Sequence, residues 1–327
     1  MPHTGRCLTG PPGRRRTPSR LVRALALALG LALAVGPAAP AHAVPARPAA
    51  EAAGDPARAD TVVCGSELHP ALAKRLGARI ASVVGSRDGA VAVGVSAFGG
   101  DLLCGYRATR EFDAASVGKV VVLGALLRTT MDQGRPLTRE EHRLATAMIT
   151  VSDNDATVRL RDELGRARIQ RFLDRAGLTR TRLDPGDAVG LMRITALDQL
   201  RLLRTLTEGD GVLGAPQRGY ARRLMASVAE DQRWGVPAGA PPGARVYVKN
   251  GWLPHGDTDV WRVNSVGAFD GTPAGPYRLV VLTDGNAGMR YGIDTVQAVA
   301  RTVHTTLNTP DAPELGATRP RSADQAR

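Results

Sequence analysis

The chain has 327 residues, a formal net charge of +12 and a sequence pI of about 10.6. This length suits one sizeable domain. The arginines are interspersed with Asp and Glu, as over residues 159–175, and do not form a basic stripe, so we expect no nucleic-acid partner.

The first segment has the three parts of an export signal. An apolar run over residues 24–35 follows a basic stretch, and Ala41-His42-Ala43 is a small-x-small cleavage site. The run is shorter than the roughly 20 residues that cross a bilayer. We therefore predict a signal peptide over residues 1–43, cleavage near Ala43, and a secreted or extracytoplasmic protein without stable membrane insertion. The Sec and twin-arginine routes both stay open.

Removal of that segment changes the charge and the cysteine count. The net charge of +12 falls to about +6, because six arginines and no acidic residues precede Val44. Cys7 is lost, and Cys64 and Cys104 remain in a compartment that permits disulfides. We predict that these two are bridged; the alternative is two separately buried thiols.

Residues 44–60 are rich in Ala and Pro and read as a linker, and residues 309–327 read as a disordered tail. Between them, apolar residues recur at helical spacing over residues 67–84. Residues 90–98 and 102–108 alternate like strands, with Gly99-Gly100 as the hairpin turn.

The middle of the chain, residues 116–228, has a helical pattern that no strand pattern interrupts. Strands are predicted again over residues 245–251, 261–269 and 277–283, and a helix over residues 291–307. Strands at both ends with helices inserted between them predict one α+β catalytic domain over residues 61–308, in which an antiparallel sheet packs against terminal helices and an all-α lobe.

Three short motifs follow one another along this domain: Ser116-Val117-Gly118-Lys119, Ser152-Asp153-Asn154 and Lys249-Asn250-Gly251. Each alone is common, as a helix start, a helix cap or a turn. Together they resemble the signatures of the class A β-lactamases and the D,D-peptidases, or penicillin-binding proteins. The third motif departs from the family, because Asn250 stands where Thr or Ser is usual.

The first motif places a nucleophile beside a base. Lys119 lies three residues after Ser116 at the start of an apolar helix, so the two side chains share one helix face. Val120, Val121 and Val122 surround the amine, and an apolar setting lowers a lysine pKa. Lys74, Lys119 and Lys249 are the only lysines of this arginine-rich chain, and an arginine could not accept the proton. We predict Ser116 as nucleophile and Lys119 as its general base.

The resemblance assigns roles to the other two motifs. It implies that Ser152 relays a proton to the leaving nitrogen and that Asn154 binds the substrate amide. Lys249 and Asn250 would bind the substrate carboxylate, and the Trp252 N–H would be the second oxyanion donor. Gly251 would let a substrate backbone approach this strand closely. The substrate would be a β-lactam or a peptidoglycan-like peptide.

The chain also departs from the class A enzymes where they hydrolyse the acyl-enzyme. The corresponding loop, residues 179–195, contains no glutamate, and Ser116 and Ser152 are only 36 positions apart. Asp187 is a tentative deacylation base, although Asp-Pro-Gly-Asp is also an ordinary turn sequence.

Three functions stay open: a serine hydrolase that acts on β-lactams, a D,D-carboxypeptidase or penicillin-binding protein with slow deacylation, and a non-catalytic module that binds cell wall or a partner. No metal-ligand spacing occurs among the histidines and cysteines, so we expect neither a metal nor a cofactor. We expect a monomer.

Overall fold

The computed structural model describes residues 60–309. The predicted signal peptide, nearly all of the linker and the tail from residue 310 lie outside the described residues. Within residues 60–309, no helix is both long and apolar enough to cross a bilayer.

One six-stranded antiparallel sheet forms the centre of the described domain. Its spatial order is β1-β3-β2-β8-β7-β6, so the first and last parts of the sequence meet where β2 pairs with β8. The strands are β1 (Val63–Gly65), β2 (Ala90–Ala97), β3 (Leu102–Tyr106), β6 (Arg245–Pro254), β7 (Val260–Asp270) and β8 (Tyr277–Ala287). The central strands are buried on both faces, because helices cover each side of the sheet.

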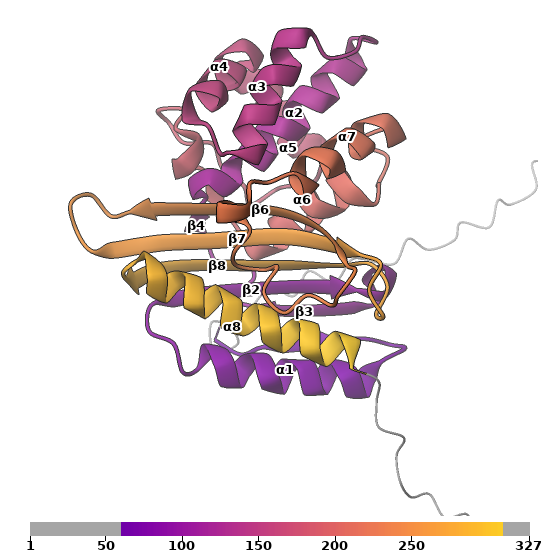
Figure 1. Cartoon of the computed structure of the whole chain (residues 1–327), viewed down its shortest axis with the longest axis vertical. Coiled ribbons are helices and arrows are strands. Elements are labelled where there is room, and N and C mark those ends of the chain that lie inside the picture. The colour runs from indigo at the N-terminus through magenta and orange to yellow at the C-terminus, as the bar shows by residue number, and fades with distance from the viewer. Residues whose placement is uncertain (1–59, 310–327) are drawn as a thin grey trace, which may run out of the picture. The chain divides into compact units, whose positions relative to one another are not determined.

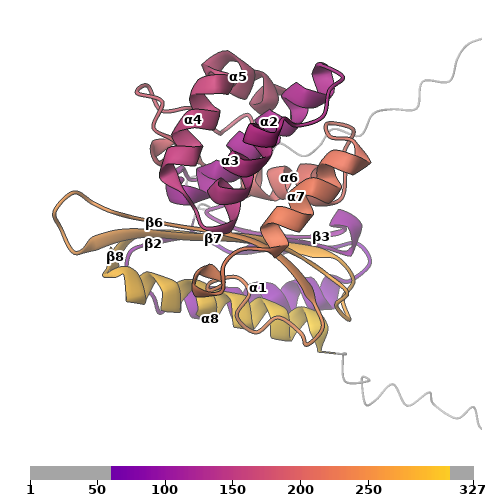
Figure 2. The same cartoon turned by 45° about the horizontal axis from the view of Figure 1, so that its top comes forward.

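Two terminal helices, α1 (Pro70–Val84) and α8 (Met289–Asn308), lie side by side on one face of the sheet (Figures 1 and 2). Helix α1 starts three residues later than predicted, since Pro70 occupies the first turn, where its missing N–H costs nothing. Leu72, Leu76 and Ile80 form its buried stripe, as the apolar spacing predicts.

The other face carries the helical lobe (Figure 2). Its helices are α2 (Lys119–Asp132), α3 (Arg139–Thr150), α4 (Asn154–Leu164), α5 (Arg166–Arg175), α6 (Ala196–Thr207) and α7 (Ala215–Ala226). Helix α2 is buried nearly all round, and the others pack their apolar stripes toward it or toward the sheet. The predicted α+β fold, with terminal helices and an inserted lobe, is confirmed.

The prediction of an uninterrupted helical middle is wrong at one place. Arg193–Ile194 forms β5, which pairs with β4 (Phe112–Asp113) just before the first motif. A two-residue strand has no periodicity of its own, and its pairing partner lies some 80 residues away, so no local pattern could indicate it. This small sheet fixes the entry of the chain into the Ser116 turn.

A disulfide joins Cys64 of β1 to Cys104 of β3, as predicted. The two residues are directly paired across the strands. The bridge ties the short edge strand β1, which sequence periodicity missed, to the rest of the sheet.

Candidate active site

Ser116 lies in a 3₁₀ turn, Ala115–Gly118, that leads directly into α2. Ala115 has φ of 46°, a left-handed conformation that is unusual for a residue with a side chain. The buried Asn264 of β7 holds the approach to this turn, because its Nδ2 donates to the carbonyl oxygens of Asp113 (2.9 Å) and Ala114 (3.2 Å). The predicted placement of Ser116 at a helix start therefore agrees with the structure.

Lys119 brings the first two motifs together. Its Nζ lies 3.0 Å from Ser116 Oγ, 3.1 Å from Ser152 Oγ, 2.6 Å from the Ser152 carbonyl oxygen and 2.7 Å from Asn154 Oδ1. The last two oxygens can only accept. A neutral amine has two N–H groups and one lone pair, so once it donates to these two acceptors, its lone pair is free for a hydroxyl proton of Ser116 or Ser152.

The surroundings of Lys119 shift its protonation equilibrium toward the neutral amine. The side chain is buried, and this burial lowers the pKa of Lys119 to about 8, while the Asp153 carboxylate acts in the opposite direction. With a pKa near 8, roughly a tenth of the amines are unprotonated at pH 7. A usable fraction of base is thus present at neutral pH.

Lys249 approaches the same hydroxyl from the sheet. It is fully buried in β6, and its Nζ lies 3.0 Å from Ser152 Oγ and 2.8 Å from the Asn250 carbonyl oxygen. Burial, reinforced by the positive charge of Lys119, lowers the pKa of Lys249 to about 7. Ser152, held at φ of 59°, therefore bridges the two lysines.

Asn154 and Asp153 have different positions. Asn154 is exposed, and only its Oδ1 is bonded, to Lys119, so within residues 60–309 its Nδ2 is free to meet a substrate. Asp153 caps α4, because its Oδ1 accepts the N–H of Ala156 at 2.7 Å.

Gly251 is required by the protein's own backbone. A Cβ at this position would lie 2.6 Å from the Ser116 nitrogen and 2.8 Å from the Val117 nitrogen. Strand β6 therefore packs directly against the nucleophile turn. The missing side chain of Gly251 makes room for this turn, whereas the prediction was that it makes room for a substrate backbone. Trp252, the predicted second oxyanion donor, follows Gly251 directly in β6.

Asn250 is not free to bind a substrate carboxylate. It is 1% exposed, and its Nδ2 donates to the carbonyl oxygens of Gln232 (2.6 Å) and Trp234 (2.8 Å), while its Oδ1 accepts from Ser265 Oγ (2.5 Å). Both N–H groups of this side chain and one of the two Oδ1 lone pairs are already used. Its position in the structure is that of a tether between β6 and a neighbouring segment.

That segment, residues 232–236, is called the wall segment here. Ser265 Oγ accepts the N–H of Val236 (2.9 Å), and the buried His304 of α8 holds the Val236 carbonyl oxygen (2.7 Å). Trp234 stacks obliquely on Trp252, with ring centroids 5.8 Å apart. The wall segment thus joins α8, the sheet and the strand beside Ser116.

Sequence reasoning missed Asn264, Ser265 and the wall segment. One signal was present: Asn264-Ser265 are two consecutive polar residues within the apolar strand sequence of residues 263–269. Polar side chains at buried strand positions require hydrogen-bond partners, and here those partners shape the site.

Residues 189–194 of the loop pack against the Ser116 turn, but the two acidic side chains of the loop, Asp184 and Asp187, bond to partners outside the hydrogen-bonded centre. Asp187 Oδ1 pairs with Arg166 at 2.6 Å, and its carbonyl oxygen accepts from Arg161. Asp184 Oδ2 accepts the N–H groups of Gly186 and Ala188, as in an ordinary turn. No hydrogen bond within residues 60–309 links Asp187 to Ser116, Lys119 or Ser152, and its role as a base stays a prediction.

Within the same residues, no group of three or more His, Cys, Asp or Glu side chains is arranged to hold a metal ion. The chemistry available at the centre is that of two hydroxyls, two amines and backbone N–H groups. This set can activate a serine, receive an oxyanion and move a proton to a leaving group.

Solved structures of similar fold were found in number. A class A β-lactamase representative from Bacteroides cellulosilyticus is 16% identical with a TM-score of 0.64, and the match covers 72% of this chain and 98% of that one. A β-lactamase from Xanthomonas campestris is 21% identical with a TM-score of 0.61, covering 71% and 97%. A PBP-A variant, solved as an acyl-enzyme complex with penicillin G, is 19% identical with a TM-score of 0.60, covering 71% and 95%.

No curated protein sequence matches the chain significantly. The sequence profile of the β-lactamase enzyme family matches residues 75–307, which include all three motifs and every helix of the lobe. The match spans well over half of the chain, and the resemblance predicted from the motifs is confirmed. The chain therefore belongs to the β-lactamase enzyme family.

Proposed function

We propose that this protein is a serine hydrolase that forms an acyl-enzyme at Ser116 on a β-lactam or a peptide-like amide. The observation that carries the proposal is the position of the Lys119 amine within hydrogen-bond distance of both Ser116 Oγ and Ser152 Oγ, with Lys249 on the far side of Ser152. Such a cluster links nucleophile, base and proton relay in one continuous chain.

In the proposed acylation step, the neutral Lys119 amine takes the hydroxyl proton of Ser116 as Oγ attacks the substrate carbonyl. The carbonyl oxygen becomes an oxyanion that accepts from the Ser116 and Trp252 N–H groups. The proton then passes from Lys119 through the Ser152 hydroxyl to the leaving nitrogen as the C–N bond breaks. Lys119 ends the step neutral, and the acyl group is bonded to Ser116.

The substrate class follows from Lys249 and Asn154. Lys249 favours an anionic substrate, because the negative charge of a substrate carboxylate would stabilise the protonated form of this buried amine, which takes up its proton from solvent. The free Nδ2 of Asn154 would donate to an acyl-amide oxygen. Both groups occur in penicillins and in the terminal peptides of peptidoglycan.

The loop of residues 179–195 favours slow hydrolysis of the acyl-enzyme, as in a D,D-carboxypeptidase or penicillin-binding protein. Residues 179–195 contain no glutamate, and Asp187 is exposed and paired with Arg166. Activation of water therefore lacks a dedicated carboxylate beside Ser116. The likeness to PBP-A, whose variant was captured with penicillin G, is consistent with this form.

Incubation with penicillin G, followed by intact mass over time, tests the proposal. We expect a covalent adduct on the wild-type protein that persists for many minutes, and no adduct on Ser116→Ala. Rapid loss of penicillin without accumulation of an adduct would favour a β-lactamase. No adduct and no turnover with any lactam or ester would instead support a non-catalytic module that binds cell wall or a partner.

We also propose that the protein is exported, as the signal-like residues 1–43 and the disulfide suggest. Mass spectrometry of the protein from the culture medium should find a chain that begins near Val44. A protein recovered only from the cytoplasm with residues 1–43 intact would contradict this.

A further inference from the structure

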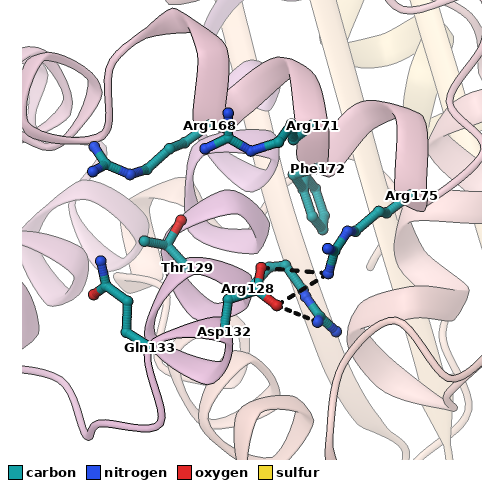
Figure 3. A pocket seen from close by; sticks show the side chains of 8 residues that line it. All are labelled: Arg128, Thr129, Asp132, Gln133, Arg168, Arg171, Phe172 and Arg175. Atoms are coloured by element: carbon teal, nitrogen blue, oxygen red, sulfur yellow. Dashed lines mark hydrogen bonds and ion pairs between the residues drawn. The ribbon is translucent and has the colours of Figure 1, made fainter. Parts of the chain in front are cut away.

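A basic concavity lies in the helical lobe at the end of α2 that is remote from Ser116. It is a cleft of about 150 Å³ (Figure 3), which we call the arginine cleft, lined by Arg128, Thr129, Asp132, Gln133, Arg168, Arg171, Phe172 and Arg175. An α-helix rises about 1.5 Å per residue, so Asp132 lies roughly 20 Å along α2 from Lys119. The arginine cleft is therefore separate from the proposed catalytic centre.

Close packing of α2 against α5 forms the cleft. Gly124 of α2 has no side chain where a Cβ would lie 2.2 Å from Phe172 Cζ, so the phenyl ring of α5 sits directly against α2. Arg168, Arg171 and Arg175 follow one another on α5 at spacings of three and four residues, which places them on neighbouring turns of one face. Figure 3 shows Arg168 and Arg171 on α5 opposite the α2 residues of the cleft.

The charges in the arginine cleft do not balance. Four guanidinium groups face one carboxylate, Asp132, which pairs with Arg128 and, at 3.0 Å, with Arg175. In the described part of the chain, Arg168 donates only to backbone carbonyl oxygens, those of Glu163 and Leu164 at the end of α4.

Two further donors in the cleft are unused. Arg171 has no hydrogen-bond or ion-pair partner within residues 60–309, and the buried Nε of Arg128 has no acceptor there. Like charges at these helical spacings repel and destabilise the helix, and a buried donor without an acceptor also costs free energy. A bound anion would relieve the repulsion among the guanidinium groups.

We propose that the arginine cleft binds a phosphate group, either free or carried on an anionic polymer. Guanidinium groups match phosphate oxygens through paired N–H donors, and several of them suit a dianion with three or four oxygens better than a carboxylate with two. Arg168 and Arg171 are the primary ligands because no carboxylate neutralises them. The Thr129 hydroxyl, on the opposite helix, is a neutral donor for the same group.

Isothermal titration calorimetry with inorganic pyrophosphate, on the chain from Val44 to Arg327 at fixed ionic strength, tests the site. We expect the wild-type protein to bind and the Arg168→Gln/Arg171→Gln variant to bind at least tenfold more weakly. The matched control, Arg245→Gln/Arg301→Gln, removes the same two charges from exposed arginines at the start of β6 and on α8, and it should bind like the wild type. Penicillin acylation should be equal in all three proteins, which shows that each is folded.

Long-chain polyphosphate, titrated in parallel, distinguishes the two sources of phosphate. Binding of both ligands with the same dependence on Arg168 and Arg171 supports a site for an isolated phosphate group, and binding of the polymer alone with that dependence supports a polymer-borne group. The proposal is overturned if neither ligand binds, or if the Arg245→Gln/Arg301→Gln control loses as much affinity as the Arg168→Gln/Arg171→Gln variant. In the latter case only the net charge of the protein attracts the anion.

Discussion

The Ser116 centre and the loop of residues 179–195 differ in how deeply their ionisable side chains are buried. At the centre, Lys119 and Lys249 are buried and converge on one hydroxyl, that of Ser152, so their pKa values fall toward neutrality. In the loop, the Asp187 side chain is 48% exposed and paired with Arg166 at 2.6 Å. Burial therefore brings ionisable groups together on one hydroxyl in the first region, whereas the carboxylate of the second region is paired at the surface.

The difference corresponds to the two halves of an acyl-enzyme reaction. Acylation needs a base beside the serine, and Lys119 lies there. Deacylation needs a base beside a water molecule, and within residues 60–309 no carboxylate is hydrogen-bonded to Ser116, Lys119 or Ser152. Each of the following predictions tests this difference between acylation and deacylation.

The largest effect is expected for Lys119→Arg. Arginine keeps the positive charge but cannot accept a proton at any ordinary pH, so the acylation rate should fall by about 10²–10⁴. Stopped-flow measurement of acylation with a chromogenic cephalosporin checks this. Lys74→Arg, a lysine of α1 on the opposite face of the sheet, is the matched control and should acylate normally. Equal rates for all three proteins would break the contrast.

Acylation should also depend on pH with a defined sign. Lys119 is a base only when neutral, so below about pH 8 the saturating acylation rate should fall about tenfold per unit, and above it the rate should level off. The apparent affinity should weaken above about pH 7, where Lys249 loses its charge. A rate that is flat between pH 6 and 9 would remove Lys119 as the base.

Asn250→Asp tests whether this side chain is a tether or a substrate ligand. The change removes two donors from the wall segment and places a carboxylate against two carbonyl oxygens, so we expect a loss of about 1–3 kcal/mol of unfolding free energy, measured by urea denaturation. Ser265→Ala breaks the same network. If Asn250 is a tether, this variant should change KM in the same direction as Asn250→Asp does. If only the Asn250 variant changes KM, Asn250 contacts the substrate.

The smallest effect is expected for Asp187→Asn. Loss of an exposed ion pair with Arg166 should cost no more than about 1 kcal/mol of stability, and deacylation should change less than twofold. Adduct lifetime by intact mass is the measurement, with Asp162→Asn as a control on the same surface. A lifetime lengthened tenfold or more would restore Asp187 as the deacylation base and end the contrast.

Much of the fold could be predicted because its signals are local. Helices α1, α2 and α8 and strands β2, β6, β7 and β8 each have enough residues to display their own period, and Pro70, Gly134 and Pro136 mark helix boundaries. The short elements β1, β4 and β5 could not be predicted, since two or three residues carry no period and their pairing depends on distant segments.

The spacing of Ser116 and Lys119 predicts the pairing of nucleophile and base, because one helical turn brings the two side chains together whatever surrounds them. The roles of Asn250, Gly251 and Asp187 depended on the tertiary structure. Asn250 bonds Gln232, Gly251 makes room for the Ser116 turn, and Asp187 pairs with Arg166. These partners lie 18 to 135 positions away in the sequence. Hydrogen bonding and burial depend on these distant neighbours, which periodicity and motifs do not encode.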